Sequence, residues 1–225
     1  RSSPLPLCQD TGSLVFFVPE TLRRRLPPEK IRRAVAIATK QGCLRKNCID
    51  SVTGASHDDN CASGAPQIHY TGASGAKRTV TLLMKGGGSE NMSRQYSLPD
   101  PSLGAGRDMD GVRRCILDAV AKAQGCACAP GILGVCIGGD RAGAYAAAKA
   151  QLLRPVGDRS PDAALAKLER EVLADANALG IGPMGMGGRT TLLGIKAVAL
   201  PRVPASFFVT VAYMCWACSR GTIEA

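Results

Sequence analysis

Aromatic residues make up only 4% of this 225-residue chain, and its only two histidines are His57 and His69. Surfaces that bind single-stranded nucleic acid stack bases on aromatic rings, so this composition is poor material for one. No uninterrupted apolar run of about 18 residues occurs, so no membrane-spanning helix is predicted. The N-terminal residues lack the apolar stretch of a signal peptide, and the chain begins without methionine, so we expect a fragment or a processed product.

Zinc-finger spacing is also absent, although the chain has ten cysteines. Cys215 and Cys218 form the one Cys-x-x-Cys pair, and no second pair follows at the distance that a zinc site requires. A secreted disulfide scaffold would be shorter and richer in loops. We therefore expect reduced thiols in the cytoplasm, several of them able to bind metal.

The formal net charge of +10 implies an anionic partner. Charge alone is weak evidence for nucleic acid, and we expect none. A small carboxylic acid would satisfy the same charge, and a solvated helix face explains short runs such as residues 23–25.

The pattern of apolar runs and capping residues predicts a mixed α/β (α+β) fold, with a mixed sheet flanked by helices and with long glycine-rich loops. Strands are predicted at 14–18, 67–70, 78–84, 132–137, 190–198 and 206–212, the second of them at an edge. Helices are predicted at 27–40, 108–124, 142–153 and 160–178, the last capped by the segment Ser160-Pro161-Asp162.

Three cysteines and five glycines surround the predicted strand 132–137. Cys126 and Cys128 precede it on a turn that Pro130 and Gly131 enforce. The glycine pair 138–139 follows it and lets the backbone approach another group closely. Such a segment can present thiolates to a cofactor, but small cysteines that merely fill the core remain an equal alternative.

Two further segments have the composition of polar sites. The turn 8–12 carries a thiol, an amide, a carboxylate and a hydroxyl within four residues. The run Lys85-Gly86-Gly87-Gly88 directly follows a strand, and consecutive glycines there make an anion-binding nest plausible. His57 and His69 could each act as a ligand or a base, but a surface or structural role is expected for both.

Thiols thus recur near strand ends at three separated places, which suits a cluster assembled by the fold. The motifs concerned resemble those of the iron–sulfur hydro-lyases, namely class I fumarate hydratase and the α part of L-tartrate dehydratase. The resemblance covers nearly the whole chain in order, through residues 8–12, 85–91, 128–131, 137–140, 180–185 and 215–217.

The resemblance implies a [4Fe–4S] cluster with three cysteine ligands and one open iron. By motif position the ligands are Cys8, Cys128 and Cys215, with Cys126, Cys136 and Cys218 as bystanders.

The resemblance also implies a reversible trans addition of water to the double bond of a small dicarboxylate, with fumarate favoured over tartrate. Asp10 is then a proton-transfer residue. The implied substrate contacts are Gln9, Arg45, Gly86 and Gly87.

The chain departs from the family at Val203, where a histidine is usual, and valine can neither donate a hydrogen bond nor carry a proton. A non-catalytic iron–sulfur or zinc relative is therefore the alternative hypothesis. Residues 1–225 are expected to form the cluster-bearing α domain without the family's extra N-terminal segment. The β half is expected to be a separate subunit or a removed domain, in an oligomeric enzyme.

Overall fold

The structure is a computed structural model that describes residues 8–72 and 79–224. The chain divides into two compact units. Unit 1 is Arg1–Gly87 together with Ser219–Ala225, and unit 2 is Gly88–Cys218. No helix in the described part of the chain is both long and apolar enough to span a membrane.

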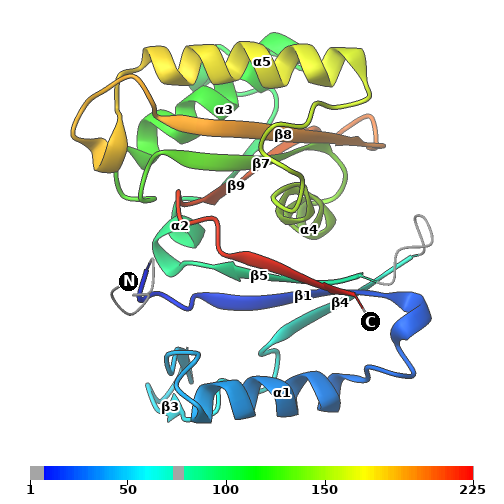
Figure 1. The fold of residues 1–225 in the computed structure, drawn as a ribbon. Helices are drawn as coiled ribbons and strands as arrows, with labels where there is room; N and C mark the ends of the chain where they lie inside the picture. Colours follow the sequence, from blue (N-terminus) through cyan, green and yellow to red (C-terminus); the bar gives the residue numbers. More distant parts are fainter. Residues whose placement is uncertain (1–7, 73–78, 225) are drawn as a thin grey trace. The chain divides into compact units, whose positions relative to one another are not determined.

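Unit 1 contains a four-stranded mixed sheet in the order β10-β5-β1-β4 (Figure 1). Its central strand β1 pairs in parallel with β4 and antiparallel with β5. Helix α1 covers one face, where Ile31 joins Val18 and Leu22 in a small apolar cluster. The strands and helices are β1 (Ser13–Pro19), α1 (Pro28–Lys40), β4 (Gln67–Thr71), β5 (Thr79–Lys85) and β10 (Arg220–Glu224).

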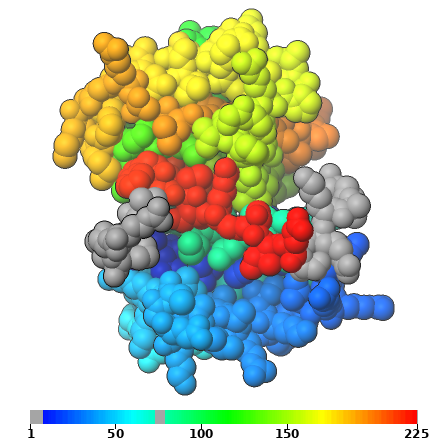
Figure 2. Space-filling model, viewed as in Figure 1, coloured from blue at the N-terminus to red at the C-terminus, as the bar shows by residue number. Residues whose placement is uncertain are grey.

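The polar face of α1 stays exposed, and the space-filling view shows this helix uncovered on the side drawn (Figure 2). Arg32, Arg33 and Lys40 lie on that face. The short antiparallel pair β2 (Cys48–Ile49) and β3 (Ser56–His57) follows α1. Turn η1 (Glu20–Leu22) links β1 to α1.

Unit 2 contains a second mixed sheet, in the order β6-β9-β7-β8. Helices α3 and α5 cover one face of this sheet and α4 covers the other (Figure 1). The strands are β6 (Arg94–Ser97), β7 (Gly131–Gly138), β8 (Leu192–Leu200) and β9 (Phe208–Met214). The helices and turns are α2 (Gly87–Asn91), η2 (Pro101–Leu103), α3 (Met109–Ala123), α4 (Arg141–Gln151), α5 (Ala163–Ala178) and η3 (Pro183–Gly185).

Strand β7 is buried at every position, as an apolar run bounded by glycines predicts. It pairs in parallel with β8 and antiparallel with β9. Gly134, in its middle, lies so close to the carbonyl group of Ala148 in α4 that no side chain would fit. The glycine therefore sets how closely this helix packs on the sheet.

These elements confirm the predicted mixed α/β fold and each predicted helix and strand, with small shifts of their ends. The predicted start of the last helix, at residue 160, was too early. Asp162 caps α5 by accepting the N–H groups of Ala164 and Leu165, and Pro161 lies outside the helix. Strands β6 and β10 were not predicted, because both are short and only half-buried or exposed.

Candidate active site

The turn 8–12 in unit 1 is held by its own hydrogen bonds. The Asp10 N–H donates to Cys8 Sγ at 3.4 Å, and the Gly12 N–H donates to Asp10 Oδ1 at 2.8 Å. An N–H group directed at sulfur stabilises a thiolate, the form of cysteine that binds iron. Cys8 and Gln9 are exposed and Asp10 is half-buried, so these side chains can meet a ligand.

The glycine run after β5 meets this turn. The Gly87 N–H donates to Asp10 Oδ2 at 3.0 Å, so both oxygens of the Asp10 carboxylate accept a backbone hydrogen bond. Gly86 is half-buried, Gly87 is exposed and Lys85 is fully buried. The predicted nest is therefore in contact with a carboxylate of the chain itself, which fixes how Asp10 is oriented.

Arg45 reaches the same turn through its backbone. Its N–H donates to Thr11 Oγ1 at 2.9 Å, while its side chain is exposed. Asn47 adds a second link, because its Nδ2 donates to the Gly12 carbonyl at 3.2 Å. Unit 1 thus brings together all six of its predicted site residues, namely Cys8, Gln9, Asp10, Arg45, Gly86 and Gly87.

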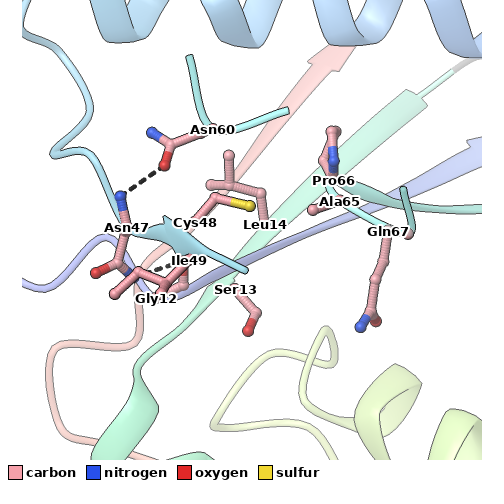
Figure 3. A pocket seen from close by; sticks show the side chains of 11 residues that line it. Gly12, Ser13, Leu14, Asn47, Cys48, Ile49, Asn60, Ala65, Pro66 and Gln67 are labelled. Atoms are coloured by element: carbon pink, nitrogen blue, oxygen red, sulfur yellow. Dashed lines mark hydrogen bonds between the residues drawn. The ribbon is translucent and has the colours of Figure 1, made fainter. Parts of the chain in front are cut away.

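Asn60 holds this arrangement and was not predicted from the sequence. It is 3% exposed, and its Oδ1 accepts the Asn47 N–H at 2.7 Å (Figure 3). Its Nδ2 donates to the Arg45 carbonyl at 2.9 Å and to Thr39 Oγ1 at 3.0 Å. Its φ of 60° lies in the left-handed region that asparagine tolerates better than most residues. That tolerance, within the turn-rich run 57–60, was the available signal.

A cavity of about 190 Å³ lies beside these residues in unit 1. Figure 3 shows Asn47, Cys48 and Asn60 on one side of it and Gln67 on the other. Its polar lining is made mainly of amide groups.

Unit 2 positions the other two predicted ligands. Cys128 has a φ of 55°, and its N–H donates to the Gly125 carbonyl at 3.0 Å, which closes the turn before β7. The glycine-rich loop at residues 180–188 supports this turn, because the Met184 N–H donates to the Ala129 carbonyl at 2.9 Å. Gly125 lies against the backbone of Met184 with no room for a side chain.

Cys215 and Cys128 lie at the same end of the sheet, where β9 ends and β7 begins. Because β7 and β9 are antiparallel and Ile132 pairs with Met214, the end of β9 lies beside the start of β7. The Trp216 N–H donates to the Cys128 carbonyl at 3.3 Å, which ties the two cysteine segments together. Both cysteines are half-buried.

Tyr213 lies next to these cysteines and was likewise not predicted from the sequence. Burial first, and then the charges of Cys128 and Cys215, raise the pKa of its hydroxyl to about 12. The hydroxyl therefore keeps its proton at neutral pH and can only act there as a donor or a neutral acceptor. Among the described residues it has no hydrogen-bond partner.

Other cysteines are in environments that favour the thiol. Burial raises the pKa of Cys136 to about 11 and that of Cys115 to about 12. Burial also raises the pKa of Cys48 and of Cys61. A protonated thiol is a poor metal ligand, so these four cysteines are suited to packing.

The two histidines lie in unit 1. His69 is on β4 and stacks on Phe17, with ring centroids 5.4 Å apart, and His57 is half-buried on β3. The stacking gives His69 a structural role.

Val203 lines a separate cavity of about 420 Å³ in unit 2. The side chain is 63% exposed. Arg141, Arg202 and Phe208 line the same cavity, together with the carboxylate residue Asp140. The guanidinium of Arg141 stacks on Phe208, and that of Arg202 on Phe207.

Within each unit, the donor side chains present suit an iron–sulfur group. Thiolates are the ligands such clusters use, Cys8 accepts a backbone N–H, and the buried Tyr213 hydroxyl beside Cys128 and Cys215 lacks a partner among the described residues. Over residues 8–72 and 79–224, no three His, Cys, Asp or Glu side chains gather closely enough to hold a metal ion. The assignment of Cys8, Cys128 and Cys215 to one cluster thus depends on their motif positions.

Comparisons with known proteins agree with these motifs. Residues 1–224 match the family model described as fumarate hydratase (Fumerase). A Geobacillus stearothermophilus protein named for class I fumarate hydratase is 50% identical over 220 residues, which cover 96% of this chain and 43% of that protein. The chain thus spans less than half the length of this relative.

Two tartrate dehydratase α subunits are also similar. The protein of that name from Methanocaldococcus jannaschii is 34% identical over 98% of this chain and 78% of its own length. The one from Escherichia coli K12 is 31% identical over 97% of this chain and 72% of its own length.

Proposed function

The chain belongs to the fumarate hydratase (Fumerase) family, and from that premise we propose that it is the α part of a hydro-lyase that interconverts fumarate and water with L-malate. The observation that carries this proposal is the family match over residues 1–224. The 50% identity to a relative named for fumarate hydratase favours fumarate, and tartrate is the second candidate substrate because of the two α-subunit relatives.

The proposed cofactor is a [4Fe–4S] cluster with Cys8, Cys128 and Cys215 as ligands. When bound, such a cluster with one iron lacking a protein ligand supplies a Lewis acid that polarises a substrate hydroxyl or carboxylate. The N–H···S bond from Asp10 to Cys8 and the antiparallel pairing of β7 with β9 support this ligand set.

The proposed roles of the remaining site residues follow from their contacts in unit 1. The exposed guanidinium of Arg45 binds a substrate carboxylate, and Gln9 offers it an amide. Asp10 transfers the proton at its carboxylate, which two backbone N–H groups hold in one orientation. Gly86 and Gly87 contact the substrate through backbone N–H groups, and at Gly87 a substrate carboxylate would compete with Asp10.

We further propose that a β subunit or β domain completes the enzyme, in a cytoplasmic oligomer that binds no nucleic acid. A β partner is supported by the two tartrate dehydratase relatives, because both are named as α subunits. The chain's length relative to the Geobacillus protein is consistent with a further part of the enzyme. Exposed thiols such as Cys8 and Cys126 support a reducing compartment.

The test is anaerobic reconstitution of the chain with iron and sulfide. We expect a visible charge-transfer band, and an EPR signal of the reduced cluster that changes on addition of fumarate or malate. A change with tartrate alone would transfer the substrate assignment to tartrate. A cluster that responds to none of these acids would support the non-catalytic alternative, for which Val203 is the specific observation.

Replacing the cysteines one at a time tests the ligand set. Cys8→Ser, Cys128→Ser and Cys215→Ser should each lose the absorbance band. Cys43→Ser and Cys61→Ser are the matched controls and should retain it. If all five variants behaved alike, the assignment of the three ligands would be wrong.

A further inference from the structure

Tyr213 is a buried side chain in unit 2 whose hydroxyl group makes no hydrogen bond to the described residues. The residue is 1% exposed, at the second-to-last position of β9. Buried polar groups are almost always hydrogen-bonded, so an unpaired hydroxyl in a packed sheet calls for a physical reason.

The chain makes specific room for this ring. Its outer end lies against the Cα atom of Gly131, so that a Cβ atom built on Gly131 would come 2.6 Å from Tyr213 Oη. No residue larger than glycine fits there while the ring keeps its place. Gly131 is three residues after Cys128, so the hydroxyl lies against the strand start that follows the cysteine turn.

Both predicted ligands of unit 2 lie on segments that adjoin Tyr213. Cys215 follows Tyr213 by two residues. Met214 pairs with Ile132 at the start of β7, and the Trp216 N–H donates to the Cys128 carbonyl at 3.3 Å, so the end of β9 is bonded to the turn that carries Cys128. Tyr96, also in this unit, has a partner: its hydroxyl donates to Asp118 Oδ2 at 2.8 Å.

We propose that Tyr213 donates its hydroxyl hydrogen to a sulfur atom of the iron–sulfur group held by Cys128 and Cys215, and so acts as a positioning residue that sets the group's reduction potential. This inference depends on the function proposed above. A hydrogen bond to sulfur withdraws electron density from the cluster and favours its reduced state, which makes the potential more positive. Gly131 serves this role by leaving space for the ring.

The test is Tyr213→Phe in the reconstituted chain, because phenylalanine keeps the ring against Gly131 and removes only the hydroxyl. We expect unchanged iron content per chain, a reduction potential shifted to more negative values, and shifted iron–sulfur stretching frequencies in resonance Raman spectra. Wild-type frequencies should move on exchange into D₂O, and those of the variant should move less. Tyr96→Phe, which removes a hydroxyl bonded to Asp118, is the matched control and should leave the potential unchanged.

The outcomes separate the two proposals. A wild-type chain that takes up no iron–sulfur group would overturn the proposed cofactor, and this inference with it. A loaded variant with wild-type potential and wild-type response to D₂O would overturn the role of Tyr213 alone. If the variant failed to load, ENDOR of the wild-type cluster would decide. The Asp10 N–H at Cys8 Sγ accounts for one coupled exchangeable proton, and the absence of a second one would refute the hydrogen bond from Tyr213.

Discussion

The Asn60 carboxamide lies between two backbone groups of the loop that carries Arg45. It donates to the Arg45 carbonyl at 2.9 Å and accepts the Asn47 N–H at 2.7 Å. Arg45 and Asn47 in turn bond to the Thr11 hydroxyl and the Gly12 carbonyl. One buried side chain therefore connects two segments of unit 1 that are far apart in sequence and that both carry proposed substrate contacts.

Asn60→Ala is expected to destabilise the chain and to weaken substrate binding. The buried backbone groups of Arg45 and Asn47 would lose their partners, and alanine is disfavoured at the φ of 60°. We therefore expect the free energy of unfolding to fall by about 3 kcal/mol, as measured by urea unfolding. Asn60→Gly relieves the backbone and keeps the hydrogen-bond loss, so it should recover part of the stability while KM stays raised. Equal KM values for Asn60→Gly and the wild type would contradict a positioning role.

Val203→His is expected to raise activity without altering stability. Val203 is 63% exposed and lines a cavity, so an imidazole fits without displacing packed groups. General acid–base catalysis by a positioned side chain contributes about 10²-fold or more, and we expect kcat/KM for fumarate hydration to rise by at least about 10-fold.

The matched control is Val203→Asn, which adds a polar group that cannot transfer a proton near neutral pH. Fumarate hydration is measured spectrophotometrically with the β part present. An asparagine variant as active as the histidine variant would show that polarity, not proton transfer, is what valine lacks.

The sequence was a good guide to the central elements and a poor one to contacts between distant segments. Strand β7 was predictable because its apolar run and flanking glycines are local features. Strand β10 was missed because it is short and exposed, and because only its pairing with β5, more than a hundred positions away, makes it a strand. Asn60 and Tyr213 were missed for the same reason, since their importance arises from the groups the fold places beside them.

The predicted ligands of unit 2 were found by a local motif, but their proximity was not. The motif identified Cys128 and Cys215, and nothing local in the sequence indicated that the end of β9 lies beside the start of β7. That adjacency follows from the antiparallel register, which the sequence does not specify.

Asp158→Asn should weaken unit 2 at neutral pH but much less in acid. Burial alone would raise the pKa of Asp158, but hydrogen bonds from Arg154 and Lys196 outweigh it and hold the pKa below its usual range. A lowered folded-state pKa contributes stability above the unfolded value near 4, and that stability is lost as the pH falls through the folded value.

Urea unfolding of the wild type and of Asp158→Asn between pH 7 and pH 3 checks this. The wild type should be more stable by about 1–2 kcal/mol at pH 7, a figure reduced because the carboxylate is partly exposed, and the gap should shrink below pH 4. Glu171→Gln, whose carboxylate lies 3.8 Å from Lys167 on the surface, should change stability little at any pH. A gap that stayed constant down to pH 3 would refute the electrostatic explanation.

Gly12→Ala should disrupt the turn that carries Cys8 and Asp10. Gly12 has a φ of +62°, and a Cβ atom there would lie 2.6 Å from the Gly86 nitrogen and closer still to the Lys85 carbonyl. These are backbone atoms at the end of β5, where Lys85 pairs with Ser13 of β1, so they cannot move aside without disturbing the strand pairing. We expect the free energy of unfolding to fall by about 3 kcal/mol or more, and the reconstituted variant to lose the cluster's visible absorbance.

Gly54→Ala separates the two causes of that loss. Gly54 has a comparable φ of +72°, but nothing lies within 4 Å of where its Cβ atom would be. It should therefore lose only the conformational term, about 1 kcal/mol, and reconstitute normally. Thermal unfolding and the absorbance of each reconstituted variant provide the comparison. Similar losses in both variants would mean that backbone conformation, rather than the close approach of the turn to the end of β5, explains why glycine is needed at position 12.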